Sequence, residues 1–341
     1  MRAAIYTGDP TLLVEERDPV PPGPGEVRIE VAYAGICGTD LHIRHGAMDD
    51  RVPERAVLGH ESSGRIAEVG EGVTPWQVGD PVTVMPLRWC GTCAACRAGH
   101  THVCQTLKVI GVDIAGAMQG SWTVPAEVVL GLPSDLPLDQ AALVEPTAVA
   151  VHDVRRADLR AGEQAVVVGG GPIGLLVARV AQAQGAEVVV LELDPHRRGV
   201  AEQLSLTVID PGQTDVAAYV QDWTSGAGAP VAFEVSGAAA GVRTATDVLG
   251  VRGRMVVVAI HSEPRLVDLN RLFLRELTIL GTRVYTREDF ETAVKLVAGG
   301  EVPAKELISR VVPLSGATEA FEALESGGGV MKVLIDCQAT S

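Results

Sequence analysis

Residues 163–194 read EQAVVVGGGPIGLLVARVAQAQGAEVVVLELD, which is an apolar run, a glycine turn, a helix-like run and a second apolar run. Gly169, Gly171 and Gly174 fit the pattern G-x-G-x-x-G directly after the run AVVV. In that context the first glycine makes the turn, the second lets the backbone approach a pyrophosphate, and the third lets the helix pack close to the strand. A purely structural glycine turn is the alternative. We interpret the stretch as the core of a dinucleotide-binding βαβ unit.

The acid that follows the second apolar run bears on which dinucleotide is bound. Glu192 lies at the offset where a carboxylate accepts hydrogen bonds from the adenosine ribose, and it would repel a 2′-phosphate. This favours NAD over NADP, although Arg197 and Arg198 are close enough to favour NADP if they are not simply solvated helix charges. Pro172 and Ile173 begin the predicted helix and complete the expected cofactor-binding turn.

The pattern of apolar runs differs between the chain before about residue 140 and the chain after it. Before about residue 140, short apolar runs separated by Gly and Pro predict an irregular, mostly β domain, in which Val27, Ile29 and Val31 alternate as in a half-buried strand. After it, apolar runs alternate with helical segments and predict a parallel, doubly wound α/β sheet. The strand-like runs are 27–36, 62–70, 81–86, 121–130, 230–237, 253–260, 277–284 and 331–336, and the helix-like runs are 139–157, 239–250, 287–300 and 317–326.

Composition limits the partners. A formal net charge of −15, from 43 acidic and 28 basic residues, argues against nucleic acid and anionic membranes, which require clustered Lys and Arg. The start MRAAIYTGDP lacks the apolar core of a secretory signal, and no apolar run is long enough to span a bilayer. We expect a cytoplasmic protein whose partner is a small molecule and whose clustered cysteines hold metal instead of forming disulfides.

Four of the six cysteines lie in the stretch WCGTCAACRAGHTHVC, residues 89–104. Their spacing is C-x2-C-x2-C-x7-C, with Cys90, Cys93, Cys96 and Cys104 as the ligands. Four thiolates complete the tetrahedral coordination of zinc and leave no open position, so this ion should stabilise a lobe without doing chemistry. His100 and His102 lie inside the lobe as competing ligands.

A third group of metal-ligand types lies upstream, on two loops. Cys37 occurs in AGICGTDLHIRHG, and His60 and Glu61 occur in LGHESSG. They offer a thiolate, an imidazole and a carboxylate, which are ligands of zinc. Taken alone, the same residues also fit a small core cysteine and a surface His–Glu pair.

Several stretches together resemble the zinc-dependent medium-chain dehydrogenase/reductase superfamily, and within it the branch of sorbitol, 2,3-butanediol and threonine dehydrogenases. In order, the stretches are GICGTDLH, GHESSG, VGDPVTV, the cysteine lobe, VEPTAVAVH, GGGPIGLL and KVLID. The resemblance, which runs nearly end to end, implies a GroES-like catalytic domain over 1–145 with 286–341 returning to it, and a Rossmann NAD-binding domain over 146–285. It also implies an oxidoreductase that transfers a hydride between a secondary alcohol, such as a polyol, diol or similar small hydroxylated aliphatic, and NAD.

The resemblance assigns the catalytic metal. It makes Cys37 and His60 ligands of a catalytic zinc, with Glu61 beside them and Glu145 approaching the metal directly or through water. Enzymes of the superfamily that act on simple primary alcohols use a second cysteine there, whereas this chain has none near Glu145, and Cys337 in the tail is expected to be inert. This departure favours the polyol and diol branch, with two zinc ions per chain.

The resemblance also implies a proton path. Bound zinc lowers the pKa of a substrate hydroxyl as it does that of water, Thr39 is placed to accept the hydroxyl proton, and His42 passes it to solvent by way of the cofactor ribose. A loop histidine without this role is the alternative for His42. No role is predicted for His45.

Other readings stay open at this point. One is an L-threonine or sugar dehydrogenase of the same superfamily. Another is a zinc-free, NADPH-dependent quinone reductase, which the retained metal-ligand types argue against. A zinc-lobe protein that binds nucleic acid would need a basic face that the composition does not provide. The run 277–282, LTILGT, matches an edge that pairs across a two-fold axis in the superfamily, which implies a homodimer or homotetramer.

Overall fold

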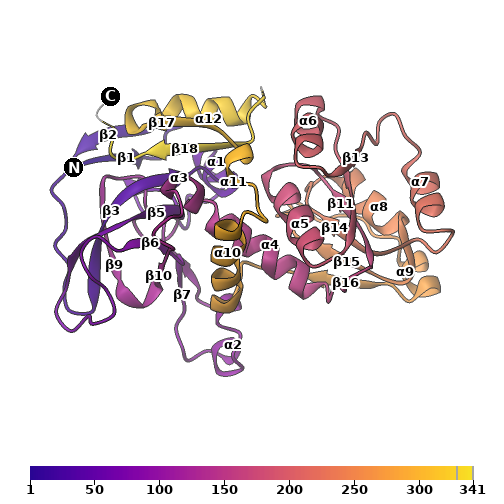
Figure 1. Cartoon of the computed structure of the whole chain (residues 1–341), viewed down its shortest axis with the longest axis horizontal. Helices are drawn as coiled ribbons and strands as arrows, with labels where there is room; N and C mark the ends of the chain where they lie inside the picture. Colours follow the sequence, from indigo (N-terminus) through magenta and orange to yellow (C-terminus); the bar gives the residue numbers. More distant parts are fainter. Residues whose placement is uncertain (328, 340–341) are drawn as a thin grey trace. The chain divides into compact units, whose positions relative to one another are not determined.

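The computed structural model describes residues 1–327 and 329–339 and consists of two compact units (Figure 1). The first unit comprises Met1–Glu145, Thr286–Ala298 and Leu307–Ser341, and the second comprises Pro146–Tyr285 and Gly299–Glu306. The short segment Gly299–Glu306, which we expected in the first unit, therefore groups with the second. The prediction of a mostly β part and a doubly wound α/β part is confirmed. Among the described residues, no helix has the length and apolar character needed to cross a membrane.

The first unit is built on a seven-stranded sheet of order β10-β6-β5-β3-β18-β17, in which β9 also pairs with β3. The strands are β3 (Glu26–Gly35), β5 (Glu61–Val69), β6 (Pro81–Val84), β9 (Ser121–Pro125), β10 (Val129–Gly131), β17 (Ile308–Pro313) and β18 (Lys332–Asp336). A smaller sheet of order β2-β1-β4 contains β1 (Arg2–Tyr6), β2 (Leu13–Glu16) and β4 (Ala56–Val57), and β7 (Leu87–Arg88) pairs with β8 (Lys108–Val109). Val27, Ile29 and Val31 are buried as their alternation predicts.

Several helices belong to the first unit or cross its boundaries with the second. Those within the first unit are α1 (Gly38–Arg44), α2 (Ala94–Arg97), α3 (Leu138–Ala141) and α12 (Ala317–Glu325), while α4 (Val144–Arg156), α10 (Arg287–Gly299) and α11 (Ala304–Leu307) cross the boundaries between the units. The C-terminal strand β18 lies between β17 and β3, with Leu334 opposite Gly35. Figure 1 shows this yellow segment beside the indigo N-terminal strands. The end of the chain therefore completes the sheet that the beginning starts.

The second unit is a parallel six-stranded sheet of order β13-β12-β11-β14-β15-β16 with helices between the strands. Its strands are β11 (Gln164–Val168), β12 (Glu187–Leu191), β13 (Thr207–Ile209), β14 (Ala229–Glu234), β15 (Leu249–Val257) and β16 (Thr278–Gly281). Its helices are α5 (Pro172–Ala183), α6 (Pro195–Gln203), α7 (Val216–Trp223), α8 (Ala239–Asp247) and α9 (Leu269–Arg275). The strands β11 and β12 are runs of valine because both of their faces are buried.

Two predicted elements are divided in the structure. The helix expected over 139–157 is α3 followed by α4, and Pro146 is the third residue of α4, where its missing N–H is no loss because first-turn N–H groups have no intrahelical partner. The strand expected over 121–130 is β9 and β10, separated after Pro125 by a short 3₁₀ turn. The two pieces pair with different strands, β9 with β3 and β10 with β6.

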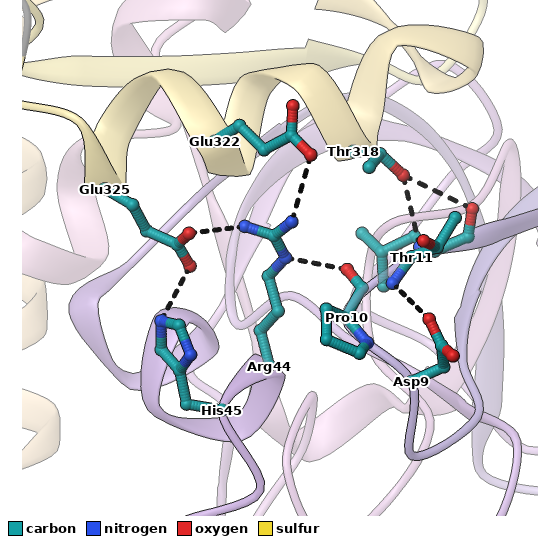
Figure 2. Close-up of polar contacts among 9 residues, drawn as sticks. Asp9, Pro10, Thr11, Arg44, His45, Thr318, Glu322 and Glu325 are labelled. Carbon is teal, nitrogen blue, oxygen red and sulfur yellow. Dashed lines mark hydrogen bonds and ion pairs between the residues drawn. The ribbon is translucent and has the colours of Figure 1, made fainter.

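A buried arginine fastens the end of α1 (Figure 2). The Arg44 Nε group donates to the carbonyl of Pro10 at 2.7 Å, while its terminal nitrogens pair with Glu325 at 2.5 Å and with Glu322 at 3.3 Å. His45 Nε2 lies 3.0 Å from the other oxygen of Glu325. Both glutamates lie on α12, so the N-terminal loop, α1 and the C-terminal helix meet at one guanidinium. His45, for which we predicted no role, belongs to this anchor.

Candidate functional site

Cys37, His60 and Glu61 come together where two paired strands meet. Cys37 follows β3 and precedes α1, whereas His60 and Glu61 lead into β5, and Gly35 is opposite Glu61 in the antiparallel register. The ligand atoms of the three residues all lie within 4.8 Å of one another. His60 and Glu61 are buried, and Cys37 is half-buried. Strand pairing therefore brings together the two loops that the sequence separates.

Asp40, which we did not predict, supports both metal-ligand candidates. Its side chain is fully buried, its Oδ2 accepts a hydrogen bond from the Cys37 N–H at 2.8 Å, and its Oδ1 lies 3.7 Å from His60 Nδ1. A carboxylate on one ring nitrogen of a histidine leaves the other free for a metal and fixes the ring orientation. Its spacing, three residues after Cys37 in CGTD, is the signal that could have identified it.

Lys332 is the second residue that the sequence analysis missed. Its ammonium is buried, forms an ion pair with Glu61 and donates to the carbonyl of Ile36 at 3.0 Å. Burial alone would lower the pKa of Lys332, but the negative charges of Glu61 and Cys37 outweigh burial and raise the pKa. The ammonium therefore stays charged beside the cluster. Lys332 is 271 residues from Glu61 in the chain, so no local pattern indicated the pair.

The electrostatics of this cluster suit a cation. Burial by itself would lower the pKa of His60, but Asp40, Cys37 and, more weakly, Glu145 raise it well above its usual value. Glu145 is buried at the start of α4. His60 Nδ1, which faces the Asp40 carboxylate at 3.7 Å, is among the buried polar atoms of the described residues that lack a hydrogen-bond partner. Thiolate, imidazole and carboxylate in a site of negative potential fit a zinc ion.

Thr39 and His42 lie on the side of α1 that is away from its buried residues. Asp40, Ile43 and Arg44 are the buried residues of this helix, whereas Thr39 is half-buried and His42 is exposed. Residues three apart on a helix are neighbours on its surface. The two residues predicted to carry the proton therefore follow one another from the partly buried start of α1 towards solvent.

The four predicted lobe cysteines converge. Their Sγ atoms all lie within 4.8 Å of one another, without either lobe histidine. None of the six cysteines of the chain is in a disulfide. Backbone N–H groups of Thr92 and Cys93 point at Cys90 Sγ at 3.4 and 3.3 Å and lower the pKa of this thiol to about 5. Cys337 is buried elsewhere, at the end of the chain. The lobe fits a structural zinc.

The glycine turn lies between β11 and α5, the context of the turn in dinucleotide-binding βαβ units. Gly169 has φ 107°, a conformation that favours glycine, and a Cβ on Gly174 would overlap the Gly169 carbonyl. Gly171 is the N-cap of α5, Pro172 is its first residue, and Ile173 follows half-buried. The helix N-terminus is thus open to an anion.

Glu192 lies directly beside this turn. Its carboxylate accepts hydrogen bonds from the backbone N–H groups of Gly170, at 2.7 Å, and Asp194, at 2.8 Å. Arg198 is engaged by Asp210 at 3.1 Å and by backbone carbonyls, whereas Arg197 lies 4.0 Å from Glu192. The positive charge of Arg198 is therefore already paired within the unit.

A further acid, Glu234, shapes the loop next to the turn. It is fully buried at the end of β14, and one oxygen accepts from the Ser236 N–H at 3.0 Å, the Ser236 hydroxyl at 2.6 Å and the Gly237 N–H at 3.0 Å. The other oxygen lies 2.9 Å from His261 Nε2. Because Ser236 lies against Gly169, this acid holds the segment that packs on the glycine turn.

Comparison with known proteins identifies the family of the chain. Residues 23–134 match the model of the alcohol dehydrogenase GroES-like domain, and residues 172–299 match that of the zinc-binding dehydrogenases. A 2-dehydro-3-deoxy-L-galactonate 5-dehydrogenase from Pseudoalteromonas atlantica is 49% identical over 99% of both chains.

Two solved structures share the fold over nearly the whole chain. The 2R,3R-butanediol dehydrogenase from Bacillus subtilis is 33% identical with a TM-score of 0.91, covering 98% of this chain and 99% of that one. A zinc-binding dehydrogenase from Sinorhizobium meliloti bound to NADP is 28% identical with a TM-score of 0.91, covering 98% of both chains. The chain is therefore an oxidoreductase that belongs to the zinc-binding, GroES-like alcohol dehydrogenase family.

Proposed function

We propose that this dehydrogenase oxidises one secondary hydroxyl of a small polyhydroxylated substrate, a sugar acid or polyol, with NAD as hydride acceptor. The observation that carries the proposal is the buried cluster of Cys37, His60 and nearby carboxylates in the first unit. The 49% identity to an enzyme named for a six-carbon deoxy sugar acid supports the substrate class. The name of the butanediol dehydrogenase, whose fold is shared, supports a secondary alcohol.

Different residues of the chain would bind the metal and carry the proton, while NAD accepts the hydride. Cys37 and His60 would hold zinc, which when bound lowers the pKa of the substrate hydroxyl. Thr39 would take the hydroxyl proton while passing its own proton on to His42 and solvent, and NAD, when bound, would accept the hydride. One hydroxyl becomes one carbonyl, and the two electrons go to NAD with the hydride. The Asp40 carboxylate, 3.7 Å from His60 Nδ1, would favour the ring orientation that leaves the other nitrogen for the metal.

NAD is favoured by the arrangement around Glu192. The carboxylate is buried beside the glycine turn, where a 2′-phosphate would meet its negative charge. Arg198 is paired with Asp210, which leaves Arg197 as the nearer cation for such a phosphate. One relative with this fold is bound to NADP, so the fold alone does not favour NAD, and the proposed preference of this chain rests on Glu192.

We also infer that the protein assembles as a homo-oligomer through the second unit. Strand β16 is an open edge of the six-stranded sheet, and Ile279 on it is partly exposed. Leu269, Phe273 and Leu274 on the adjacent α9 are each at least two-thirds exposed. An open strand edge beside a large apolar patch is the kind of surface that a second copy covers.

A substrate panel tests the proposed function. Purified protein with measured zinc content is assayed with sugar acids, polyols, diols and hydroxy amino acids, each with NAD and with NADP. We expect NAD-dependent oxidation of a sugar acid or polyol, and little activity on primary alcohols. Activity confined to hydroxy amino acids, or quinone reduction with NADPH, would refute the substrate class.

Matched variants connect any activity to the cluster. Cys37→Ser and His60→Ala should lose the catalytic zinc and all turnover while the cysteine lobe keeps its metal. Glu145→Gln should keep substantial zinc and lose most turnover, because an acid that exchanges with solvent near the metal is needed for the reaction more than for retention. Full turnover in zinc-free Cys37→Ser would exclude a zinc mechanism.

A further inference from the structure

Two positively charged side chains of the first unit share one carboxylate. The oxygens of Asp113 accept hydrogen bonds from Arg51 Nη2 at 2.8 Å and from Arg51 Nε at 3.3 Å. The ammonium of Lys108 lies 3.7 Å from Asp113 Oδ1. The side chain of Asp113 is only 3% exposed, whereas those of Arg51 and Lys108 are 40% and 59% exposed. A nearly buried anion therefore holds two cations that water can still reach.

The guanidinium of Arg51 keeps donors for a second acceptor. A guanidinium has five N–H groups, and Asp113 takes one from Nε and one from Nη2. Among the described residues, none accepts a hydrogen bond from Arg51 Nη1. The side chain is thus fixed in place by Asp113 and still able to bind another anion.

A third cation lies beside these two. Arg88 ends β7 and is directly opposite Lys108, which begins β8, and both residues are exposed. Directly opposite residues of a strand pair have their side chains on the same face, where like charges are destabilising. An anion bound beside them would remove this repulsion. The result is a local excess of positive charge in a chain whose net charge is −15.

The turn that carries Asp113 packs on the segment that leads to His60. A Cβ on Gly111 would overlap the carbonyl of Gly59 and come within 2.9 Å of the His60 nitrogen. The Ala117 N–H, after the turn, donates to the Gly59 carbonyl at 2.8 Å. The turn is therefore fixed against the backbone next to a ligand of the proposed catalytic zinc.

Arg51 lies on the loop that joins the two parts of the proposed catalytic site. This loop leads from α1, which carries Thr39 and His42, to β4, which ends three residues before His60. Its ion pair with Asp113 connects the loop to the turn that packs beside His60. The two cations held by Asp113 are thus positioned by the same segments that position the catalytic residues.

The acids of the same loop do not cancel this positive charge. Asp49 accepts a hydrogen bond from the Tyr6 hydroxyl at 2.9 Å. Asp50 and Glu54 are exposed, and water and salt screen the charges of exposed side chains. Asp113 is the one acid that contacts both Arg51 and Lys108 among the described residues.

We propose that Arg51 and Lys108, held in place by Asp113, bind the carboxylate of a sugar acid and so select this substrate over an uncharged polyol. A guanidinium matches a carboxylate in charge and in geometry. The carboxylates of the substrate and of Asp113 together balance the charges of the two cations. The inference rests on the proposed function, whose substrate class it narrows to the acids.

Steady-state kinetics on matched compounds test the subsite. Zinc-loaded protein is assayed with NAD and with pairs that differ only in a carboxylate against a hydroxymethyl group, L-galactonate with galactitol and D-gluconate with sorbitol. Arg51→Met should raise the KM for the acid about 10–100-fold, as expected for the loss of a hydrogen bond between charged groups. The kcat and the KM for the alditol should stay nearly unchanged. Where the alditol is not oxidised, its inhibition constant takes the place of KM.

Further variants separate binding of the carboxylate from support of the loop. Arg55→Met is the matched control, because Arg55 is an exposed arginine of the same loop that pairs with Glu15, and it should change neither KM. Arg51→Lys keeps the charge and should recover part of the affinity for the acid. Lys108→Met should give a smaller rise in the same KM, and it decides the question if Arg51→Met does not fold.

The outcomes separate this inference from the proposed function. An equal rise in KM for acid and alditol, or equal effects of Arg51→Met and Arg55→Met, would overturn the inference, since Arg51 would then only support its loop. A wild type that oxidises alditols but no sugar acid would also overturn it, while the proposed dehydrogenase remains. Absence of NAD-dependent oxidation of any sugar acid or polyol would refute the proposed function itself, and with it the inference.

Discussion

At the scale of single residues, Glu192 joins the glycine turn to the strand next to it. Both of its oxygens already accept backbone hydrogen bonds, at 2.7 and 2.8 Å, which hold the carboxylate at the place where the ribose hydroxyls of NAD should come. A carboxylate oxygen can accept more than one hydrogen bond, so these contacts orient the group without using it up.

Replacing this acid should change cofactor choice. We expect Glu192→Ala to raise the KM for NAD and to reduce discrimination against NADP, because the ribose partner and the repulsion of a 2′-phosphate are both removed. Steady-state kinetics with the two cofactors measure the change, with Glu187→Ala, on the exposed start of the same strand, as control. A wild-type preference for NADP would show instead that Arg197 outweighs Glu192.

Asp113 gives a prediction for the dependence of stability on pH. Burial alone would raise the pKa of its carboxyl, but hydrogen bonds from Arg51, at 2.8 and 3.3 Å, and from the Val109 N–H, at 2.8 Å, lower it below its usual value. Since the folded pKa is lowered, this stabilisation is present above the unfolded pKa of about 3.9 and is lost as the pH falls through the folded value.

Asp113→Asn should therefore reduce the free energy of unfolding by about 1–3 kcal/mol at pH 7, and the difference from wild type should shrink as the pH falls below about 4. Thermal melts at several pH values measure it. Asp158→Asn, which removes an exposed pair with Arg160, is the control and should have little effect at any pH. A difference that is constant with pH would contradict the role of the charge.

What the sequence could predict at this scale depended on distance along the chain. Cys37, His60 and the four lobe cysteines lie in short stretches whose residue types and spacing indicate metal. Asp40 could have been identified from its position three residues after Cys37, whereas a lysine at the start of an apolar strand has no meaning until strand pairing places it beside the cluster. The partners of Lys332 lie at residues 36 and 61.

At the scale of elements, the cysteine lobe is a short segment with little core of its own. Its helix α2 has four residues, none of them buried, and Cys104 is the one lobe cysteine that is buried. Such a segment depends on its metal for order, since zinc binding supplies the folding free energy of small metal lobes.

Cys93→Ser should accordingly lower the melting temperature and the soluble yield, while the protein that remains folded keeps most of its turnover per catalytic zinc. Zinc analysis should find about one ion fewer per chain, in line with a single four-cysteine site. Cys337→Ser, in which a buried cysteine outside both clusters is changed, is the control. A fully stable Cys93→Ser protein that has lost turnover would contradict a structural role.

The ion pairs of Arg44 that anchor α1 to α12 are a second feature at this scale. Arg44 is buried, whereas its partners Glu325 and Glu322 are partly exposed, with side-chain exposures of 24% and 59%. Because water can still reach these carboxylates, loss of the guanidinium should cost less than the loss of one member of a fully buried pair.

We expect Arg44→Met to lower the free energy of unfolding by about 1–3 kcal/mol, measured by denaturant titration. Arg28→Met, which removes a more exposed pair with Glu68, should cost about 0–1 kcal/mol. Equal losses of unfolding free energy in the two variants would show that the burial of Arg44 does not strengthen its ion pairs.

Elements were predicted well where periodicity was sustained and less well where proline occurred. The alternation of Val27, Ile29 and Val31 and the valine runs of β11 and β12 gave strands in the right places. The helix expected over 139–157 and the strand expected over 121–130 were each wrong as single elements. The strand divides after Pro125, whereas the helix divides between Ala141 and Val144, just ahead of Pro146. In both, the apolar pattern continues across the break, and the pattern alone does not show where backbone hydrogen bonding stops.

At the scale of the whole molecule, assembly should depend on the apolar surface of the second unit. Phe273→Asp places a charge in the patch formed with Leu269 and Leu274. We expect light scattering to show an oligomer for wild type and a smaller species for this variant, since a buried unpaired charge is costly. Val20→Asp, at a similarly exposed valine of the first unit, should leave the mass unchanged. A monomeric wild type would refute the inferred assembly.

The place of β18 between β17 and β3 has a consequence for the order in which the molecule is made. When the ribosome has finished the first 145 residues, β3 has its partners β5 and β9 but still lacks β18, and Glu61 has no lysine. Domains of most chains fold in the order of their synthesis. Here the nucleotide-binding unit is complete before the unit that begins the chain, so the first domain to be started is the last to be finished.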